Sequence, residues 1–506
     1  MIGRIITLIK LHNKLRINWY AAIGEAEGGR IKMKSFKLPI HAVALLALTA
    51  GGAAAQTAPT QTTQTQTAQT QPAPAQVYAG GTLPASMWSS NFVGPLAGIA
   101  KPLFNWGFRF DITDTDQMLD NVSEGVTGKE GRFANTNKLK PAIYIDLQKL
   151  LGIPNAQFHI AETFHLLKEH GGTNAASDSG WQGVSNSAAL SIVHQNTTEP
   201  NTLSWLTYEQ HFMNGQLDWE IGRMNPQLLM YTPNCDNIMT CTDDLLGYDA
   251  SITGPSFSTW TNKLVYNFTP TTYVQWIMSE VDLHDQKTRG FHFGTDGDTG
   301  YINMAEVAYK TNYAITPYPM FWEWGGWTEH LSVPYTDPWT SVKVSDTSGI
   351  GIQGQNIVWR QDGGATNSNT NPRIGTVVRL FATPDQSNVY QGQFELGLNV
   401  YSLIPGRPYD IFGVKLADFL LGDHEAKFLS KSQMGAGGSP LSRNSQYWEI
   451  NGHIQITPQV AFEPVVMYAV NPDNFINPKT KETQNGFIVG AFVTVNFGQI
   501  LGLAGQ

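Results

Sequence analysis

The sequence predicts an all-β protein, a transmembrane antiparallel β-barrel of about sixteen strands with short periplasmic turns and longer extracellular loops. Three observations support this fold class. Apolar and polar residues alternate over segments of about ten residues. Charged residues make up only 14% of the chain, which also holds 49 glycines and 11% aromatic residues. After the leader, no apolar run reaches the length of about 20 residues that a membrane-spanning helix requires.

The alternation is clearest in the C-terminal half. Residues 391–399, 448–456 and 487–497 each place apolar side chains on one face and polar side chains on the other. A strand of a soluble sheet alternates over about five or six residues, whereas segments of about ten are typical of a lipid-facing wall around a wet lumen. Aromatic residues stand at the ends of these segments, as in the girdles of such barrels: Trp448, Phe487 and Phe497.

Two hairpins are predicted in the N-terminal half. Residues 204–212 and 216–221 alternate on either side of Asn214-Gly215, which is a strong hairpin signal. Residues 261–268 and 273–281 alternate on either side of a Thr-Pro-Thr turn. Helical and strand patterns do not alternate along the chain, so a βαβ architecture is disfavoured.

The N-terminal part reads as three segments ahead of the barrel. Residues 33–55 have a lysine-containing start, an apolar run and an alanine cleavage signal, which is typical of a secretory signal peptide. Residues 1–32 do not fit ahead of such a signal, so we interpret them as a non-native upstream extension and Met33 as the true start. Residues 56–85 are rich in Gln, Thr and Pro and predict a disordered linker. Residues 86–506 are predicted to form the outer-membrane barrel.

Charge and cysteine content restrict the function. The chain carries a net charge of -9, and without residues 1–55, which hold eight basic and two acidic residues, the charge is -15. This acidic balance argues against a nucleic-acid partner. Cys235 and Cys241 are expected to form a disulfide, because the exported compartment is oxidising. Metal binding is the alternative for this pair, but two cysteines without a nearby histidine make a poor site.

Motifs in several segments resemble the carbohydrate-selective porin family, the OprB-type porins. The most specific is residues 396–413, which contain Gly406-Arg407-Pro408 followed by Asp410. The other segments are residues 103–107 with 120–125, residues 147–158, residues 205–222 and residues 447–472. The resemblance covers residues 85–497 and implies a sixteen-stranded outer-membrane barrel through which glucose and other small sugars diffuse. The chain departs from the pattern at Glu124 and in continuing past Phe497 to Gln506.

Residues that select solutes are expected on the lumen face. A sugar channel needs aromatic faces for pyranose rings and polar groups for hydroxyls. Strand parity and local sequence nominate nine residues, whose alternative interpretation is that they are ordinary solvated wall residues: Trp205, Glu209, Asp218, Glu220, Arg360, Arg379, Glu395, Glu449 and His453.

The predicted function is a passive channel for small carbohydrates such as glucose in the outer membrane of a Gram-negative bacterium. A general or organic-acid-selective porin is the first alternative, and a barrel enzyme or a secreted all-β binding protein is less favoured. No catalytic set, metal site or cofactor is expected, since the histidines lack H-E-x-x-H spacing. The expected partners are small sugars and outer-membrane lipids, with either a homotrimer or a monomer as the assembly.

Overall fold

The computed structural model describes the barrel and many of its connections. The chain divides into two compact units, Met1–Ala73 and Pro74–Gln506, and every described residue belongs to the second. The predicted upstream extension, signal peptide and disulfide all fall outside the described residues and stay predictions. The described ranges are residues 79–82, 84–123, 133–165, 168–170, 201–226, 229, 258–282, 289–336, 343–384, 388–473 and 485–505.

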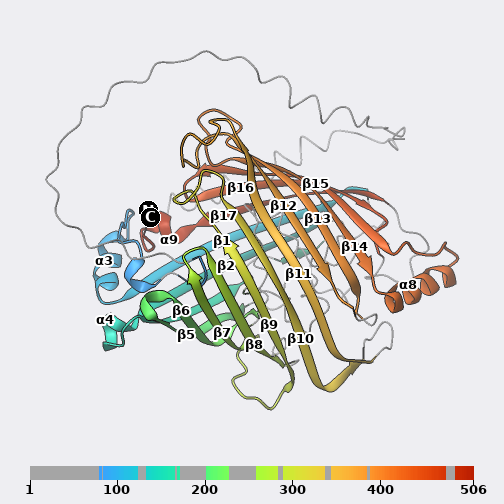
Figure 1. Cartoon of the computed structure of the whole chain (residues 1–506), viewed down its shortest axis with the longest axis horizontal. Helices are drawn as coiled ribbons and strands as arrows, with labels where there is room; N and C mark the ends of the chain where they lie inside the picture. Colours follow the sequence, from blue (N-terminus) through green and yellow to red (C-terminus); the bar gives the residue numbers. More distant parts are fainter. Residues whose placement is uncertain are drawn as a thin grey trace. The chain divides into compact units, whose positions relative to one another are not determined.

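Seventeen strands form one sheet in the described part of the chain (Figure 1). They are β1 (Phe108–Asn121), β2 (Phe133–Asp146), β3 (Ala156–Phe164), β4 (Lys168–His170), β5 (Asn201–Phe212), β6 (Leu217–Met224), β7 (Thr259–Thr269), β8 (Thr272–Asp282), β9 (Asp298–Lys310), β10 (Met320–Thr336), β11 (Lys343–Arg360), β12 (Arg373–Ala382), β13 (Tyr390–Tyr401), β14 (Ile411–Leu421), β15 (Asn444–Thr457), β16 (Val460–Val470) and β17 (Gly486–Asn496).

Short helices flank these strands. They are η1 (Ala85–Met87), α3 (Ala97–Asn105), α4 (Leu147–Leu151), η2 (Met213–Gly215), α8 (Asp423–Gly435) and α9 (Phe497–Leu501). None of the helices in the described ranges combines the length and apolar character needed to cross a membrane.

The sheet closes on itself into a barrel. Neighbouring strands pair antiparallel, and the last strand, β17, pairs with β1, where Val493 lies opposite Asp116. β3 and β4 both pair with β2, so they share one position in the wall. Counted over the described strands, the ring therefore has sixteen positions, which confirms the predicted barrel.

The barrel wall reverses the polarity of a soluble core. On β13, Phe394 is 39% exposed and Leu396 is 46% exposed, whereas Glu395 between them is fully buried. The same pattern recurs on β15, where Trp448 and Ile450 are exposed and Glu449 is buried. Because successive side chains of a strand point to opposite faces, the apolar set forms an outer face and the polar set an inner face. This is the arrangement that the alternation in the sequence predicts.

Both predicted hairpins are present. β5 and β6 are joined through η2, where Asn214 and Gly215 adopt φ values of 57° and 87°. These left-handed conformations favour Asn and Gly, which explains the Asn-Gly signal. β7 and β8 are joined by a tight turn in which the Thr272 amide donates to Thr269 Oγ1 at 3.0 Å.

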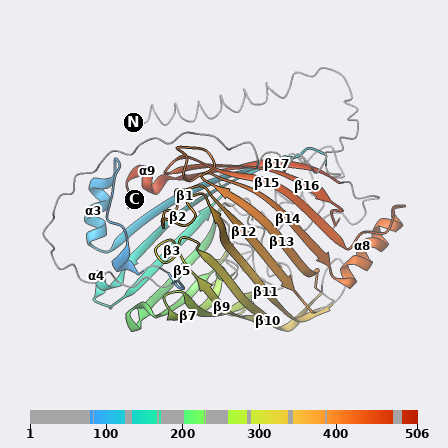
Figure 2. The ribbon, with the colours of Figure 1, turned by 45° about the horizontal axis from the view of Figure 1, so that its top comes forward.

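The two ends of the barrel differ. α3, α4 and α9 lie at one end, and α8, which connects β14 to β15, lies at the other (Figures 1 and 2). The hairpin turns of β5–β6 and β7–β8 belong to the end that carries α4, which we name the short-turn end. Segments before β1 and after β17 meet there, since the Leu96 amide donates to the Leu501 carbonyl at 2.8 Å. The opposite end is named the long-loop end.

Candidate functional site

The inner face of the barrel is the candidate site, because polar side chains from neighbouring strands meet there. The predicted carboxylates are buried on this face, at no more than 4% exposure: Glu209, Asp218, Glu220, Glu395 and Glu449. Arg379 is 2% exposed on the same face, and Trp205 and His453 are partly buried. The structure thus brings eight of the predicted residues together on the inner face, and the ninth, Arg360, is buried at its short-turn end.

One series of inner-face residues runs across β8 to β13, and we name it the arginine ladder: Tyr273, Glu323, Gln353, Arg379 and Glu395. Tyr273 Oη donates to Glu323 Oε1 at 3.2 Å, and Gln353 donates to the same carboxylate. Arg379 Nε donates to Gln353 Oε1 at 3.1 Å, and its guanidinium lies 3.8 Å from Glu395 Oε2. Strand register places the last four residues side by side, so each reaches its neighbour.

Charged pairs continue along the following strands. Lys415 Nζ on β14 lies 3.5 Å from Glu449 Oε2 on β15, and Asn451 Nδ2 donates to Glu449 Oε1 at 2.7 Å. Further along β15, His453 Nδ1 lies 2.5 Å from Glu463 Oε1 on β16. Acids and bases therefore alternate along this wall, which limits the cost of burying them.

A second group lies on the other wall, over β5 to β7. Glu220 Oε1 accepts hydrogen bonds from Trp205 Nε1 at 2.7 Å and Thr207 Oγ1 at 2.8 Å. Glu220 Oε2 accepts from Lys263 Nζ at 2.5 Å. Lys140 Nζ lies 5.9 Å from the centre of the Trp205 ring. The tryptophan is thus held at its ring nitrogen and faces a cation.

Aromatic rings extend this wall across β2, β3 and β5. Tyr144 stacks on His159 with ring centres 4.2 Å apart, and His159 lies 5.5 Å from Trp205. We name these three residues the aromatic row. The Arg109 guanidinium lies 5.1 Å from the Tyr144 ring centre, and Trp88 meets Tyr144 edge-on at 5.9 Å. The row offers flat apolar faces next to charged groups.

Residues 79–82 are bound to the inner face at its short-turn end. The Gly80 amide donates to Asn267 Oδ1 at 3.0 Å, and Asn267 Nδ2 donates back to the Gly80 carbonyl at 3.2 Å. The Thr82 amide donates to Asp218 Oδ2 at 3.0 Å. These contacts cover residues at the C-terminal end of the segment expected to be a linker, so part of that segment is seated against the barrel wall.

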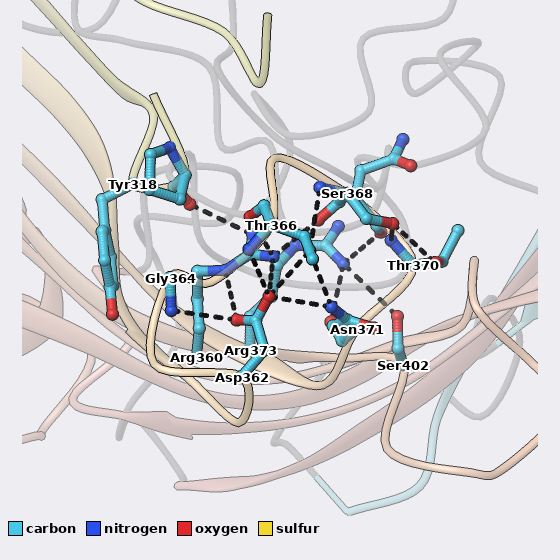
Figure 3. Close-up of polar contacts among 12 residues, drawn as sticks. Tyr318, Arg360, Asp362, Gly364, Thr366, Ser368, Thr370, Asn371, Arg373 and Ser402 are labelled. Carbon is cyan, nitrogen blue, oxygen red and sulfur yellow. Dashed lines mark hydrogen bonds and ion pairs between the residues drawn. The ribbon is translucent and has the colours of Figure 1, made fainter. Parts of the chain in front are cut away.

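Arg360 lies in a different environment from the other predicted residues (Figure 3). Its Nε donates to Asp362 Oδ1 at 2.9 Å, and its terminal nitrogens donate to the Pro317 carbonyl at 3.1 Å and the Ser368 carbonyl at 2.8 Å. The hydrogen bond from Arg360 is the main cause that holds the pKa of Asp362 well below its usual range. This guanidinium thus joins the β9–β10 and β11–β12 turns, and the role of Arg360 in solute selection stays a prediction.

Several inner-face residues were missed by the sequence reasoning. Alternation along the strand could have identified three of them, because they lie on the same face as polar residues of their own strands: Lys263, Glu323 and Lys415. No local signal predicts the seating of residues 79–82, which read Ala-Gly-Gly-Thr shortly after a Gln/Thr/Pro-rich stretch.

Comparison with known proteins places this geometry in a family. A model of the carbohydrate-selective porin, OprB family, matches residues 130–497. No curated protein matched the sequence. The high-pH structure of Pseudomonas putida OprB is 19% identical, covers 81% of this chain and 99% of its own, and superposes with a TM-score of 0.66.

Two further structures are more distant. The low-pH structure of Pseudomonas putida OprB is 14% identical with a TM-score of 0.49, and the matched region covers 81% of this chain and 99% of that one. The outer membrane channel DcaP of Acinetobacter baumannii is 11% identical with a TM-score of 0.41, over 77% of this chain and 96% of its own. The fold comparison depends on the high-pH structure.

Proposed function

The chain belongs to the carbohydrate-selective porin family (OprB family), and we infer that it forms an outer-membrane channel through which small carbohydrates such as glucose diffuse passively. The family and the closed barrel indicate a channel rather than an enzyme. We further propose that the short-turn end faces the periplasm and the long-loop end faces outward, as is usual for bacterial barrels. The exposed apolar side chains of the outer face would then contact membrane lipids.

The observation that most favours sugars is the mixture of donors, acceptors and aromatic faces on the inner wall. A sugar hydroxyl both donates and accepts hydrogen bonds, so it needs carboxylates and cations side by side. The arginine ladder supplies this alternation through Glu323, Arg379 and Glu395. The aromatic row supplies the partly buried ring of Trp205 for the apolar side of a pyranose ring.

The same geometry disfavours selection of organic acids. A channel for anions needs cations whose charge is available to the solute. Arg379, Lys263 and Lys415 each lie within 4 Å of a carboxylate, at 3.8, 2.5 and 3.5 Å. Their charge is therefore largely balanced by the wall itself, which suits a neutral polar solute.

Liposome swelling with the refolded protein tests this function. Glucose should enter faster than size-matched amino acids or organic acids. Equal rates for all small solutes would remove the sugar selectivity, and no swelling from a demonstrably folded barrel would remove the channel.

Arg379→Gln tests whether the arginine ladder takes part. The change keeps a donor beside Gln353 but removes the charge, so glucose entry should slow about fivefold, as expected for ~1 kcal/mol of lost interaction. Arg443→Gln is the control, because the Arg443 side chain is 42% exposed and pairs with Asp423 outside the ladder. An unchanged glucose rate in Arg379→Gln would remove Arg379 from the proposed site.

A further inference from the structure

We propose that Glu209, His211 and Asp218 form a binding site for one divalent cation of the zinc class, beside the β5–β6 hairpin. His211 on β5 lies opposite Asp218 on β6 in the strand register, and Glu209 lies two residues before His211 on the same face. One oxygen from each carboxylate and one imidazole nitrogen lie within 4.8 Å of one another. The proposal goes beyond sugar diffusion and does not depend on it.

The imidazole ring stands between the two carboxylates without bonding to either. His211 Nε2 lies 3.9 Å from Glu209 Oε1, and His211 Nδ1 lies 3.8 Å from Asp218 Oδ1. These distances exceed those of hydrogen bonds. Ligand atoms around one tetrahedral zinc ion, each at about 2.0–2.1 Å from the metal, lie roughly 3.4 Å apart. With one ligand atom from each residue, the three atoms lie within 4.8 Å of one another, so small side-chain adjustments would bring them to coordinating distance.

Two of the candidate ligand atoms are buried without a hydrogen bond. His211 Nε2 and Asp218 Oδ1 make none within the described residues. His211 and Asp218 are only 5% and 1% exposed, so bulk water does not supply hydrogen bonds to these atoms. Buried polar atoms in folded proteins nearly always have a partner. An unpartnered imidazole nitrogen and an unpartnered carboxylate oxygen, both buried in one cluster of ligand-type groups, point to a ligand bound there.

The charge of the cluster also favours a cation. Lys263 Nζ, at 2.5 Å, neutralises Glu220, and it lies farther, at 3.9 Å, from Asp218 Oδ2. Glu209 receives its hydrogen bonds from neutral groups of Gln157 and Thr82. Two buried carboxylates thus share little positive charge, and a buried charge without a counter-charge is strongly unfavourable. One divalent cation would balance both.

The chemistry of the donor set selects the zinc class. Zinc binds imidazole nitrogen and carboxylate oxygen in three-residue sites that leave a fourth position for water. Calcium and magnesium prefer sites built from oxygen alone. The sequence predicted no metal site because the ligands are two residues apart on a strand and then across a hairpin, a spacing that only strand pairing brings together.

Zinc titration of the tag-free, EDTA-dialysed protein in detergent tests the site. Calorimetry and metal analysis should find one zinc ion per chain, with calcium and magnesium unable to displace it. His211→Gln and Asp218→Asn should each weaken binding at least tenfold. His330→Gln is the matched control, because His330 Nδ1 lies 2.9 Å from Asp346 Oδ1 but both side chains are exposed; its zinc affinity should equal that of the parent chain.

Two outcomes overturn the proposal. One is the absence of stoichiometric zinc binding to the folded parent protein, and the other is equal affinity in the parent chain and the His211→Gln, Asp218→Asn double variant. If the variants fail to fold, zinc binding to the folded parent protein still tests the proposal.

Discussion

Replacing Lys263 with methionine tests whether the inner wall depends on balanced charge. Lys263 Nζ lies 2.5 Å from Glu220 Oε2, and both residues are no more than 4% exposed. Removing one partner of a buried ion pair destabilises a protein by about 3–5 kcal/mol, because the other charge stays buried. Trp205 and Thr207 still donate to Glu220 in the variant. We therefore expect the free energy of unfolding to fall by about 3 kcal/mol, at the lower end of that range.

Urea unfolding of the refolded barrel, followed by tryptophan fluorescence, measures this change. Adding Glu220→Gln to Lys263→Met should restore much of the lost stability, since the unbalanced charge is removed. Arg443→Met is the matched control: its pair with Asp423 is similarly short at 2.6 Å, but the side chains are 42% and 30% exposed. That control should lose no more than about 1 kcal/mol. A loss of less than about 1 kcal/mol in Lys263→Met itself would refute the reasoning.

Two more predictions concern His292, in the loop of residues 289–297, and Gly81, in the segment of residues 79–82 bound to the inner face. The hydrogen bond to Asp282, with another to Asp296, raises the pKa of His292 above its ordinary value of 6.5. Protonated His292 therefore stabilises residues 289–297 fully below about pH 6.5, and amide exchange there should speed up as pH rises through the raised pKa. Gly81→Val should loosen residues 79–82, because a Cβ would meet Asp218 Oδ2 at 2.6 Å. Loss of 1–2 kcal/mol would raise amide exchange about 5–30-fold.

Each of these predictions has a matched control. His292→Gln should remove the pH dependence that exceeds the intrinsic base-catalysed rise in exchange, and an excess that persists would assign it to another group. Gly437→Val carries nearly the same backbone strain as Gly81→Val, with φ of 87° against 86°, but its Cβ would meet nothing within 4 Å. If both glycine variants change the exchange of residues 79–82 equally, direct contact with Asp218 is not the cause.

The sequence by itself determined the class of fold, the hairpins and the face on which many residues lie. Period-two alternation is a local property, because successive side chains of a strand point to opposite faces whatever the strand pairs with. Leu396, Glu395 and Leu398 therefore already indicated a polar inside and an apolar outside. The Asn214-Gly215 turn was readable for the same reason, since its backbone conformation is set by those two residues.

The tertiary structure decided which inner-face residues meet. Contacts such as Tyr273 with Glu323 depend on strand order and register, which join positions far apart in the chain. The local sequence placed Arg360 in the pore without revealing its partners, which are carbonyls that the folded turns supply at the end of the barrel. The seating of residues 79–82 on Asp218 and Asn267 could not be read locally either, because these contacts join positions 136 and 187 residues apart in the chain.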